Sequence, residues 1–452
     1  MNQKTKRTLI YSIGFIVLLF GLFLILHFQI PAVQKRIFVF AIWFFAEIYL
    51  WITIVRTFQW FKKCNEKNKF RIISEWILTV LYWMPALMVA LAAISLAKNS
   101  VHGINTTFYL TIMGSSVIQY IIKFILFCLL IPFDIISFII KKLKREKRKI
   151  YEKVRKWRNV MLQSAFYLYL IGLILMTYGM IYVAEEFETR KITLDTKNPI
   201  FQKNPTKIVL ISDMHLATWR SSKPVQDIVD QVNKLNPDYI FFGGDMVQFS
   251  SHEMDPYMTI LKGFRPEKGI YSVLGNHDYA TYARYENETA QINDVLRLVS
   301  LQEQLGWHVL RNSNERITVD TLGNSFVIAG IEFYSPTKMF INQGNIEKTY
   351  ENIKLDDFVL LISHSPDVWD SIKVRHLPAF LTVSGHTHGM QVGFMNEKHR
   401  WSPGRLIYKY WGGLYQDPKE QIRNLYVNVG LASIGFPSRI GLHPEITLIE
   451  LK

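Results

Sequence analysis

Five apolar stretches in the first 184 residues constrain the fold of this chain more than any other feature. They cover residues 8–30, 37–56, 76–97, 107–131 and 160–183. A helix needs roughly 20 residues to cross the hydrocarbon core of a bilayer, and each stretch is about that long. The first stretch is too long for a cleaved signal peptide, and further apolar stretches follow it. Residues 1–184 are therefore predicted to form an α-helical membrane bundle of five spans.

The basic residues between these stretches predict the orientation of the bundle. Lys and Arg gather before the first stretch, between the second and third, and in the loop KKLKREKRKIYEKVRKWR before the fifth, whereas the alternate loops carry few. Positively charged loops stay in the cytoplasm, so the N-terminus is expected inside. An odd number of spans then places residues 185–452 outside the cytoplasm, in a multi-pass cell membrane protein. Binding of anionic lipids is another use of the basic loop, compatible with this topology.

The distribution of charge argues against a nucleic-acid partner. Residues 185–452 contain 28 Lys and Arg against 31 Asp and Glu, whereas the whole chain has 52 and 37. The positive excess therefore lies in the membrane half, where topology explains it. Both cysteines, Cys64 and Cys128, also lie there. The second half thus has no disulfide framework and no cysteine zinc site.

Residues 185–206 read as a polar linker, and residues 207–452 as an ordinary α/β domain. Helical patterns follow Pro224 and cover about 286–305. Short apolar runs predict strands at 207–212, 238–242, 269–274, 325–333, 358–363, 380–384, 425–430 and 445–451. A βαβ opening followed by many strands is typical of a mixed sheet or of two packed sheets.

Metal-binding residue types follow five of these strands. The loops carry Asp213-Met214-His215, Gly243-Gly244-Asp245, Gly275-Asn276-His277-Asp278, His364 and Gly385-His386-Thr387-His388-Gly389. Ligand sites in α/β sheets assemble at the carboxyl ends of strands, so these loops are expected to converge. The glycines allow tight turns that bring side chains close to a shared ion.

The side chains in these loops are sufficient for a pair of divalent cations. The predicted metal ligands are Asp213, His215, Asp245, Asn276, His364, His386 and His388. Two ions roughly 3.5–4 Å apart need three or four ligands each and a bridging group, which the carboxylate of Asp245 can supply. The mixture of oxygen and nitrogen donors favours Mn, Fe or Zn over Ca or Mg. A water bridging the ions would be deprotonated near neutral pH and act as the nucleophile.

His277 and Asp278 are the predicted catalytic residues. His277 is expected to act on the leaving-group oxygen or to steady the phosphoryl charge, with Asp278 holding its orientation. Each motif alone is a weak signal, because a single Asp-x-His or a buried histidine is usually structural. All five motifs in order, each at the end of a predicted strand, are hard to obtain by accident.

This ordered set, D-x-H, G-D, G-N-H-D, H and G-H-x-H, resembles the calcineurin-like metallophosphoesterase superfamily over about 207–452. The resemblance implies a four-layer sandwich with two mixed sheets flanked by helices. It also implies one metal held by Asp213, His215, Asp245 and His388, and the other by Asp245, Asn276, His364 and His386, with His277 catalytic.

The end of the chain, GLASIGFPSRIGLHPEITLIEL, looks like the ending of the membrane-associated YkuE/YaeI-type branch, and the layout resembles the transmembrane proteins with a metallophosphoesterase domain. Met390 departs from that branch, which commonly has a second glycine after G-H-T-H-G. The departure is expected to alter the groove beside the metals without removing a ligand.

Several other residues can be interpreted either as functional or as purely structural. One group forms either a lip that faces substrate or lipid, or an ordinary packed loop, and both roles are predicted equally. It consists of Arg400, Trp401, Arg405, Tyr408, Tyr410 and Trp411. Arg439 either contacts a phosphate or caps local structure. Surface or packing roles are favoured for His252, His308, His376, His399 and His443. An interhelical pair, or a snorkelling lysine, is favoured for Glu47 and Lys123.

These observations predict a membrane-anchored phosphoesterase that hydrolyses phosphate mono- or diesters of a membrane-proximal or lipid-linked substrate. Membrane lipids are the other expected partners. One alternative is a hydrolase like those that cleave the pyrophosphate of UDP-2,3-diacylglucosamine in lipid A synthesis, although the predicted topology opposes it. Another is a membrane transporter or sensor whose second half is a non-enzymatic binding module.

Overall fold

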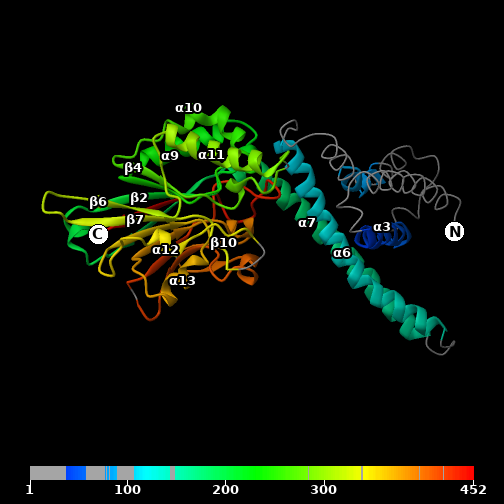
Figure 1. Ribbon diagram of the computed structural model, residues 1–452. Helices are drawn as coiled ribbons and strands as arrows, with labels where there is room; N and C mark the ends of the chain where they lie inside the picture. The colour runs from blue at the N-terminus through cyan, green and yellow to red at the C-terminus, as the bar shows by residue number, and fades with distance from the viewer. Residues whose placement is uncertain are drawn as a thin grey trace. The chain divides into compact units, whose positions relative to one another are not determined.

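The computed structural model describes residues 37–57, 77, 79–80, 82–88, 106–142, 148–283, 285–336, 340–396, 398–420 and 422–452. The chain divides into two compact units, Met1–Leu175 and Met176–Lys452. Figure 1 shows the helices α3, α6 and α7 and the sheets of the second unit.

Three long helices lie in the first part of the chain, α3 (Ile37–Thr57), α6 (Thr106–Lys142) and α7 (Arg148–Ile181). By length and composition, two segments of the described residues suffice to cross a membrane, Gly114–Ile140 and Lys149–Glu185. They correspond to the fourth and fifth predicted spans. The second predicted span coincides with α3, in which a shorter apolar segment, Phe45–Ile54, is recognised. The span predicted at 8–30 lies outside the described residues, as does most of 76–97, so a bundle of five spans remains a prediction.

The charged residues inside the predicted spans pair with each other. Lys123 Nζ of α6 donates a hydrogen bond to Glu47 Oε2 of α3 at 3.2 Å and another to the Tyr82 carbonyl at 2.9 Å. Both side chains are buried. The interhelical pair favoured for Glu47 and Lys123 is therefore present.

The second unit contains two six-stranded mixed sheets. In the first sheet, with strand order β1-β14-β2-β3-β4-β5, the strands β2 (Thr206–Ile211), β3 (Tyr239–Phe242), β4 (Gly269–Ser272) and β5 (His308–Val309) run parallel, and β14 (Glu445–Leu451) is antiparallel to β2. In the second, with order β12-β13-β9-β8-β7-β6, the strands β13 (Asn424–Val427), β9 (Leu381–Ser384), β8 (Val359–Ser363) and β7 (Ser325–Ile331) run parallel. The outer strands β12 (Gly413–Gln416) and β6 (Ser313–Thr318) are antiparallel to their neighbours.

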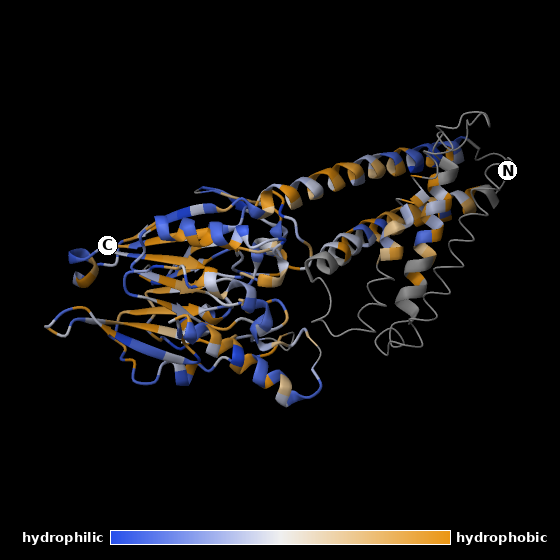
Figure 2. Ribbon diagram, turned by 90° about the horizontal axis from the view of Figure 1, so that it is seen from above, coloured by the Kyte–Doolittle hydropathy of each residue, from blue (hydrophilic) through white to orange (hydrophobic). Residues whose placement is uncertain are grey.

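Apolar side chains on both faces of each sheet build four layers. Between the sheets, Leu210 and Phe241 of the first pack with Ile328, Leu360 and others of the second. On the outer face of the first sheet lie α9 (Lys223–Lys234), α10 (Met258–Leu261) and α11 (Glu288–Gln304). On the outer face of the second lie α12 (Ile346–Thr349) and α13 (Val368–Val374). In Figure 2 the apolar residues concentrate on the strands inside these layers, and the helices show polar outer faces. The two mixed sheets flanked by helices agree with the expected sandwich.

Residues 185–206, predicted as a linker, are instead part of the domain. They contain β1 (Glu188–Leu194) and the short helix α8 (Pro199–Lys203), and β1 pairs in parallel with β14 along its whole length. The polar sequence ETRKITL misled the prediction because β1 is an edge strand with few buried side chains. Its partner lies about 250 residues further along the chain, beyond the reach of any local pattern.

Candidate metal centre

The five metal-binding motifs meet at one end of the two sheets. They directly follow β2, β3 and β4 of the first sheet and β8 and β9 of the second. Within each sheet these strands are parallel neighbours, so their carboxyl ends lie at the same edge. All seven predicted metal ligands are therefore carried by loops at the same edges of the two sheets.

The first cluster of donor atoms surrounds Asp213. Its Oδ1 lies 3.1 Å from His388 Nε2, and His388 Nε2 lies 3.3 Å from His215 Nε2. All three side chains are buried. Their donor atoms can contact one cation together.

The second cluster surrounds Asp245. Its Oδ2 lies 3.1 Å from His364 Nε2 and 3.6 Å from His215 Nε2. His364 Nε2 is also 3.9 Å from Asp213 Oδ1, which links the two clusters. Asp213, Asp245 and His364 form a group able to hold a cation, and so do His215, Asp245 and His277. Asp213, His215 and Asp245 each belong to two of the three groups, so the bridging role of Asp245 stays a prediction.

Asn276 and His386 complete the predicted set at the periphery of these clusters. The amide nitrogen of Asn276 donates to the Tyr282 hydroxyl at 3.0 Å, which leaves its carbonyl oxygen for another contact. The His386 ring lies edge-on to the His364 ring, with centroids 5.1 Å apart. His386 is outside the three closest groups of donors, but it lines the same pocket as Asp245 and Asn276.

Unpaired buried atoms show that these residues fit metal ions. His364 Nε2 and Asn276 Oδ1 are buried, and within the described part of the chain neither makes a hydrogen bond, although His364 Nε2 lies within ion-pair distance of Asp245 Oδ2. Leaving a buried polar atom unpaired costs about 1–3 kcal/mol, so such atoms in a cluster of donors indicate a missing partner. Imidazole nitrogens combined with carboxylate and amide oxygens suit Mn, Fe or Zn. The donor set thus fits two divalent ions.

Hydrogen bonds from the second atom of each group fix the orientation of the ligands. His364 Nδ1 contacts the Gly243 carbonyl at 2.7 Å, and His388 Nδ1 contacts the Ala432 carbonyl at 3.2 Å. Such contacts select the tautomer that presents Nε2 to a metal. Asp245 Oδ1 accepts the backbone N–H of His277 at 2.8 Å, which leaves Oδ2 facing the histidines.

The backbone of the motif loops is strained. Positive φ angles occur at five of the seven predicted ligands: Asp213, His215, Asp245, His386 and His388. Non-glycine residues rarely adopt this region, and it recurs at functional sites. Two glycines of the motifs are required for close approach. A Cβ at Gly385 would lie 2.3 Å from Asp213 Oδ2, and one at Gly275 would lie 2.2 Å from Asp245 Oδ1.

His277 lines the same pocket as Asp245 and Asn276, but Asp278 does not have the predicted role. His277 Nδ1 contacts the Gln248 carbonyl at 2.9 Å, and its ring stacks on Tyr282. Asp278 instead accepts the backbone N–H groups of Asp245, Met246, Val247 and Gly275 at 2.8–3.2 Å. The expectation that Asp278 orients the His277 ring is therefore wrong. Adjacent residues in a tight turn point apart, so Asp278 faces the β3 loop and holds the backbone that carries Asp245.

Charge in the cluster is arranged in complementary pairs. Burial raises the pKa of Asp245, but the neighbouring His364 outweighs it and holds the pKa far below its ordinary value. Burial lowers the pKa of His364, and the Asp245 carboxylate more than compensates, raising it to about 9. Burial, with the charge of His364, lowers the pKa of His386 to about 3. The carboxylates are therefore ionised, as metal ligands must be.

A pocket of about 430 Å³ opens onto the cluster. Besides predicted site residues, it is lined by apolar and aromatic side chains: Tyr282, Phe340, Met390, Tyr408, Ile434 and Phe436. Sequence reasoning missed Phe340, Ile434 and Phe436, because isolated apolar residues in loops carry no recognisable pattern. Ile434 and Phe436 lie shortly after β13, at the same edge of the sheet as the motif loops. Their position after a predicted strand could therefore have indicated that they line the site.

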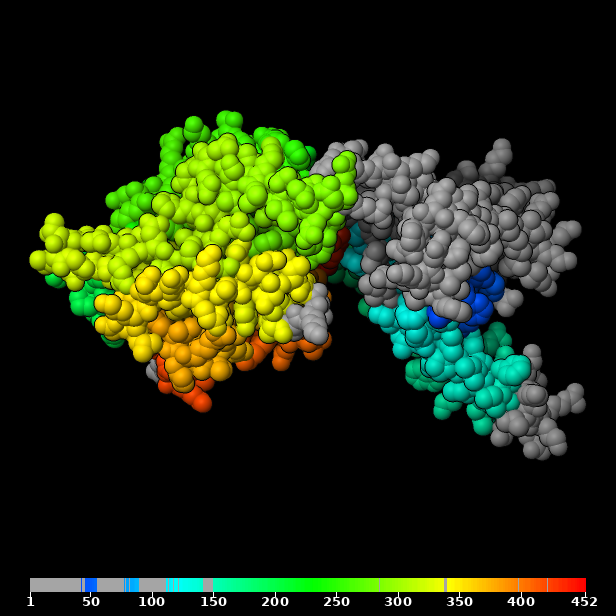
Figure 3. Space-filling model, in the orientation of Figure 1, coloured from blue at the N-terminus to red at the C-terminus, as the bar shows by residue number. Residues whose placement is uncertain are grey.

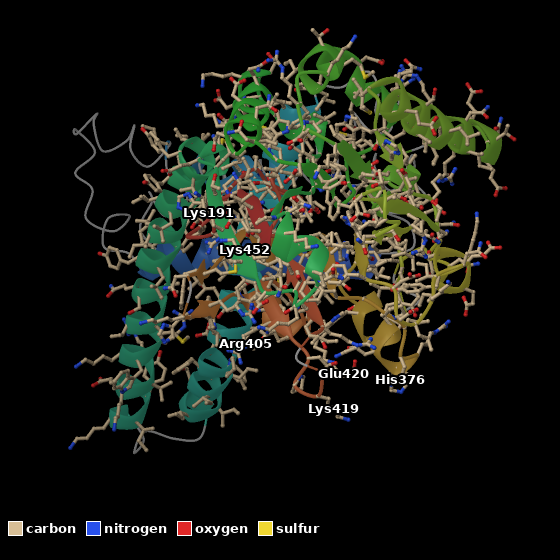
Figure 4. All side chains as sticks on the ribbon, turned by 90° about the vertical axis from the view of Figure 1, so that its left-hand side faces the viewer. Lys191, His376, Arg405, Lys419, Glu420 and Lys452 are labelled. Carbon is tan, nitrogen blue, oxygen red and sulfur yellow. The ribbon has the colours of Figure 1, made fainter. Side chains whose placement is uncertain are left out.

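The other residues with two interpretations are now resolved. Tyr410 and Trp411 are buried in the core, whereas Trp401 and Arg405 are exposed. Figure 4 labels Arg405. Arg439 is fully buried, and it donates to the carbonyls of Val429, Gly430 and Ala432. It therefore caps the loop beside His388. His252, His308, His376 and His399 are exposed, and His376 lies at the periphery of the domain (Figure 4).

The fold is a two-sheet α/β sandwich, and the cluster is a candidate centre for metal ions. A profile of the calcineurin-like phosphoesterase family matches residues 206–390. This part of the chain is therefore a calcineurin-like metallophosphoesterase domain. The matched residues include all seven predicted ligands, His277 and Asp278.

Relatives of known name share this domain. A transmembrane protein with metallophosphoesterase domain from Danio rerio is 26% identical over 287 residues, which cover 63% of this chain and 61% of the relative. The uncharacterized metallophosphoesterase YkoQ of Bacillus subtilis is 25% identical over 270 residues, 59% of this chain and 91% of that protein. A crystal structure of a dimetal phosphatase from Danio rerio covers 50% of this chain and 88% of its own, at 12% identity and a TM-score of 0.31. This chain thus spans about six tenths of the length of the transmembrane relative from Danio rerio.

Proposed function

We propose that this protein is a membrane-anchored phosphoesterase that uses two divalent metal ions to hydrolyse phosphate mono- or diesters. One observation carries the proposal: acidic, imidazole and amide donors from five separate loops converge, and His364 Nε2 and Asn276 Oδ1 are left without hydrogen bonds in the described residues. Ions held here would polarise a phosphoryl oxygen and lower the pKa of a bound water toward neutrality.

The chain's own residues would do the remaining work. Asp213, His215 and His388 would hold one ion, and Asn276, His364 and His386 the other, with Asp245 between them. His277 keeps Nδ1 on the Gln248 carbonyl, so its Nε2 is available for the phosphoryl group or the leaving oxygen. Stacking on Tyr282, with centroids 4.2 Å apart, holds the ring in place.

The membrane assignment rests on α6 and α7 and on the basic loops. We propose five spans with the N-terminus in the cytoplasm, which places the metal centre outside the cytoplasm near the membrane surface. A membrane-proximal or lipid-linked phosphoester is then the natural class of substrate. A reporter fused after Lys452 tests the topology. Alkaline phosphatase active at this position supports the proposal, whereas a reporter active only in the cytoplasm overturns it and favours the lipid A pyrophosphatase alternative.

Activity is tested with the full-length protein in detergent, using bis(4-nitrophenyl) phosphate and added Mn²⁺. Hydrolysis should stop with a chelator and should be abolished by Asp245→Asn, which removes the charge shared by the two clusters. His376→Asn is the matched control because His376 is exposed, follows α13 and lies at the periphery of the domain (Figure 4). An Asp245→Asn protein as active as the wild type would overturn the proposal and leave a binding module as the better interpretation.

A further inference from the structure

Five exposed apolar side chains lie on the segment that follows the last metal motif. We call Met390, Phe394, Trp401, Leu406 and Ile407 the apolar lip. Leu406 is 86% exposed and Ile407 64%, and Phe394 and Trp401 are nearly half exposed. Single apolar residues on a surface are ordinary, but a group of large ones on one short segment indicates an interaction site.

Local contacts hold the lip together. Phe394 of β10 (Phe394–Met395) pairs with Trp401 of β11 (Arg400–Trp401) across a two-stranded ribbon. The Ser402 hydroxyl donates to the Gly389 carbonyl at 2.5 Å, which ties the turn before Leu406 to the motif loop. A Cβ at Gly404 would lie only 3.5 Å from Met390 Cγ, so this turn also packs on Met390.

The lip is continuous with the wall of the metal pocket. Met390 belongs to both. Tyr408, directly after Ile407, also lines the pocket, and its ring meets the His386 ring edge-on at 5.6 Å. An apolar group resting on the lip would therefore lead to the metal-binding side chains.

Hydrogen bonds connect the other wall of the pocket to the end of α7. Gln391 Nε2 donates to the carbonyls of Phe436 and Ser438 at 2.9 and 2.8 Å. The Ser438 hydroxyl in turn donates to the Met176 carbonyl at 2.8 Å. The apolar helix that is long enough to cross a membrane thus ends against the segment that lines the metal pocket.

The occupant that fits the lip best is the surface of a lipid bilayer. The last turn of α7 already links the pocket wall to an apolar helix. A bilayer around that helix therefore accounts for the lip without a further protein partner. Exposed basic side chains accompany the lip: Lys398, Arg405 and Lys409. Apolar side chains interleaved with Lys and Arg are typical of segments that enter the headgroup region of anionic membranes.

We propose that the apolar lip inserts into the bilayer that α7 enters, and that the metal centre takes amphiphilic phosphoesters whose hydrocarbon tail remains in that bilayer. The substrate part of this inference rests on the proposed phosphoesterase function. The insertion itself does not, because it requires only the lip and the membrane.

A lipid-borne quencher tests the insertion. Full-length protein with Cys64→Ser and Cys128→Ser receives Leu406→Cys, is labelled with the fluorophore NBD, and is reconstituted into vesicles of phosphatidylcholine and phosphatidylglycerol. Leu355→Cys is the matched control: Leu355 is also highly exposed, at 79%, and precedes β8, at the end of the strand opposite the metal motifs. Doxyl-labelled lipid should quench the probe at 406 and leave the probe at 355 unchanged.

Two results would overturn the insertion. Equal emission from both probes would show that the lip stays in water. A blue-shifted probe at 406 that the lipid cannot quench would show that a protein, such as a second copy of this chain, covers the lip.

A pair of synthetic substrates tests the tail. Hexadecyl 4-nitrophenyl phosphate and ethyl 4-nitrophenyl phosphate share the reacting group and differ in the hydrocarbon. Leu406→Glu should raise KM for the hexadecyl ester in vesicles severalfold more than for the ethyl ester, and Leu355→Glu should change neither. An equal effect on both esters would contradict the role of the lip. Failure of the wild type to hydrolyse either ester would instead contradict the proposed function, while the quenching result stands.

Discussion

Asp278 Oδ2 accepts the backbone N–H of Asp245 at 2.8 Å, across the gap between the β4 and β3 loops. Asp278 is buried. Among the described residues, its carboxylate makes no hydrogen bond to the imidazole of the neighbouring His277. Its carboxylate is shared among four backbone donors, three of which belong to the β3 loop at and after Asp245. The aspartate in the G-N-H-D motif thus acts on the position of a metal ligand.

Asp278→Asn should therefore weaken metal binding while leaving His277 in place. An amide nitrogen would face backbone N–H groups, which leaves two donors unpaired at a cost of about 1–3 kcal/mol each. Loss of such a support typically lowers metal affinity or activity about 10–100-fold. Titration with Mn²⁺ checks this, and added metal should restore much of the rate. A loss of rate that saturating metal leaves unchanged would place Asp278 in the chemical step instead.

His277→Ala should show the opposite pattern. The ring of His277 is held by Gln248 and Tyr282, although its centroid lies 4.8 Å from that of the His215 ring. Its removal leaves the seven predicted ligands in place, so it should spare most of the metal content. A positioned acid or base contributes about 10²–10⁴-fold, and kcat should fall by that order. Parallel measurement of kcat and bound metal separates the two roles. A variant that keeps its rate but loses metal would make His277 a ligand.

The sequence predicted which donor residues gather at one edge of the sheets more completely than it predicted the architecture. Each motif lies directly after a short apolar strand, and this pattern is visible locally in the sequence. Because parallel strands end at one edge of a sheet, the pattern also predicts that the motifs gather in one site. The predicted role of Asp278 was wrong because orientation within a turn is not visible in spacing. The edge strand β1 was missed because its pairing with β14 joins distant parts of the chain.

The apolar lip could not be recognised because exposure depends on tertiary packing: Trp401 is exposed, whereas Trp411, ten residues later, is buried. In Figure 3 the yellow and orange segments around residues 330–420 share one continuous surface, an arrangement that spacing does not reveal.

The backbone at Met390 has a conformation that favours glycine. Its φ and ψ are 49° and 23°, in the left-handed region, which costs a residue with a side chain roughly 1–2 kcal/mol. Met390→Gly should therefore raise the stability of the protein by up to about 1 kcal/mol, because the greater flexibility of glycine in the unfolded chain offsets part of the gain. Met390→Val should lower it, since a branched side chain fits this region poorly. Thermal unfolding of the two variants gives the order, and a valine variant more stable than the glycine variant would contradict it.

Gly179 should be sensitive to any side chain. A Cβ there would lie 2.2 Å from the Arg439 carbonyl oxygen and 2.6 Å from Ser438 Oγ. Gly179→Leu should separate the last turn of α7 from the pocket wall and destabilise the protein by about 1–3 kcal/mol. Gly172→Leu is the control in the same helix, because a Cβ at Gly172 would have no described atom within 4 Å. Thermal unfolding of the detergent-solubilised protein compares them, and equal Tm values for the two variants would show that α7 does not pack here.

Seven side chains from five loops are expected to hold two metal ions. Elemental analysis of the purified full-length protein, after incubation with Mn²⁺, Fe²⁺ or Zn²⁺ and removal of free metal, measures this binding most directly. We predict about two ions per chain, in line with a two-metal site, and a loss of both in Asp245→Ala, because that carboxylate faces both clusters. A chain that binds no metal, or that binds the same amount without Asp245, would contradict the account.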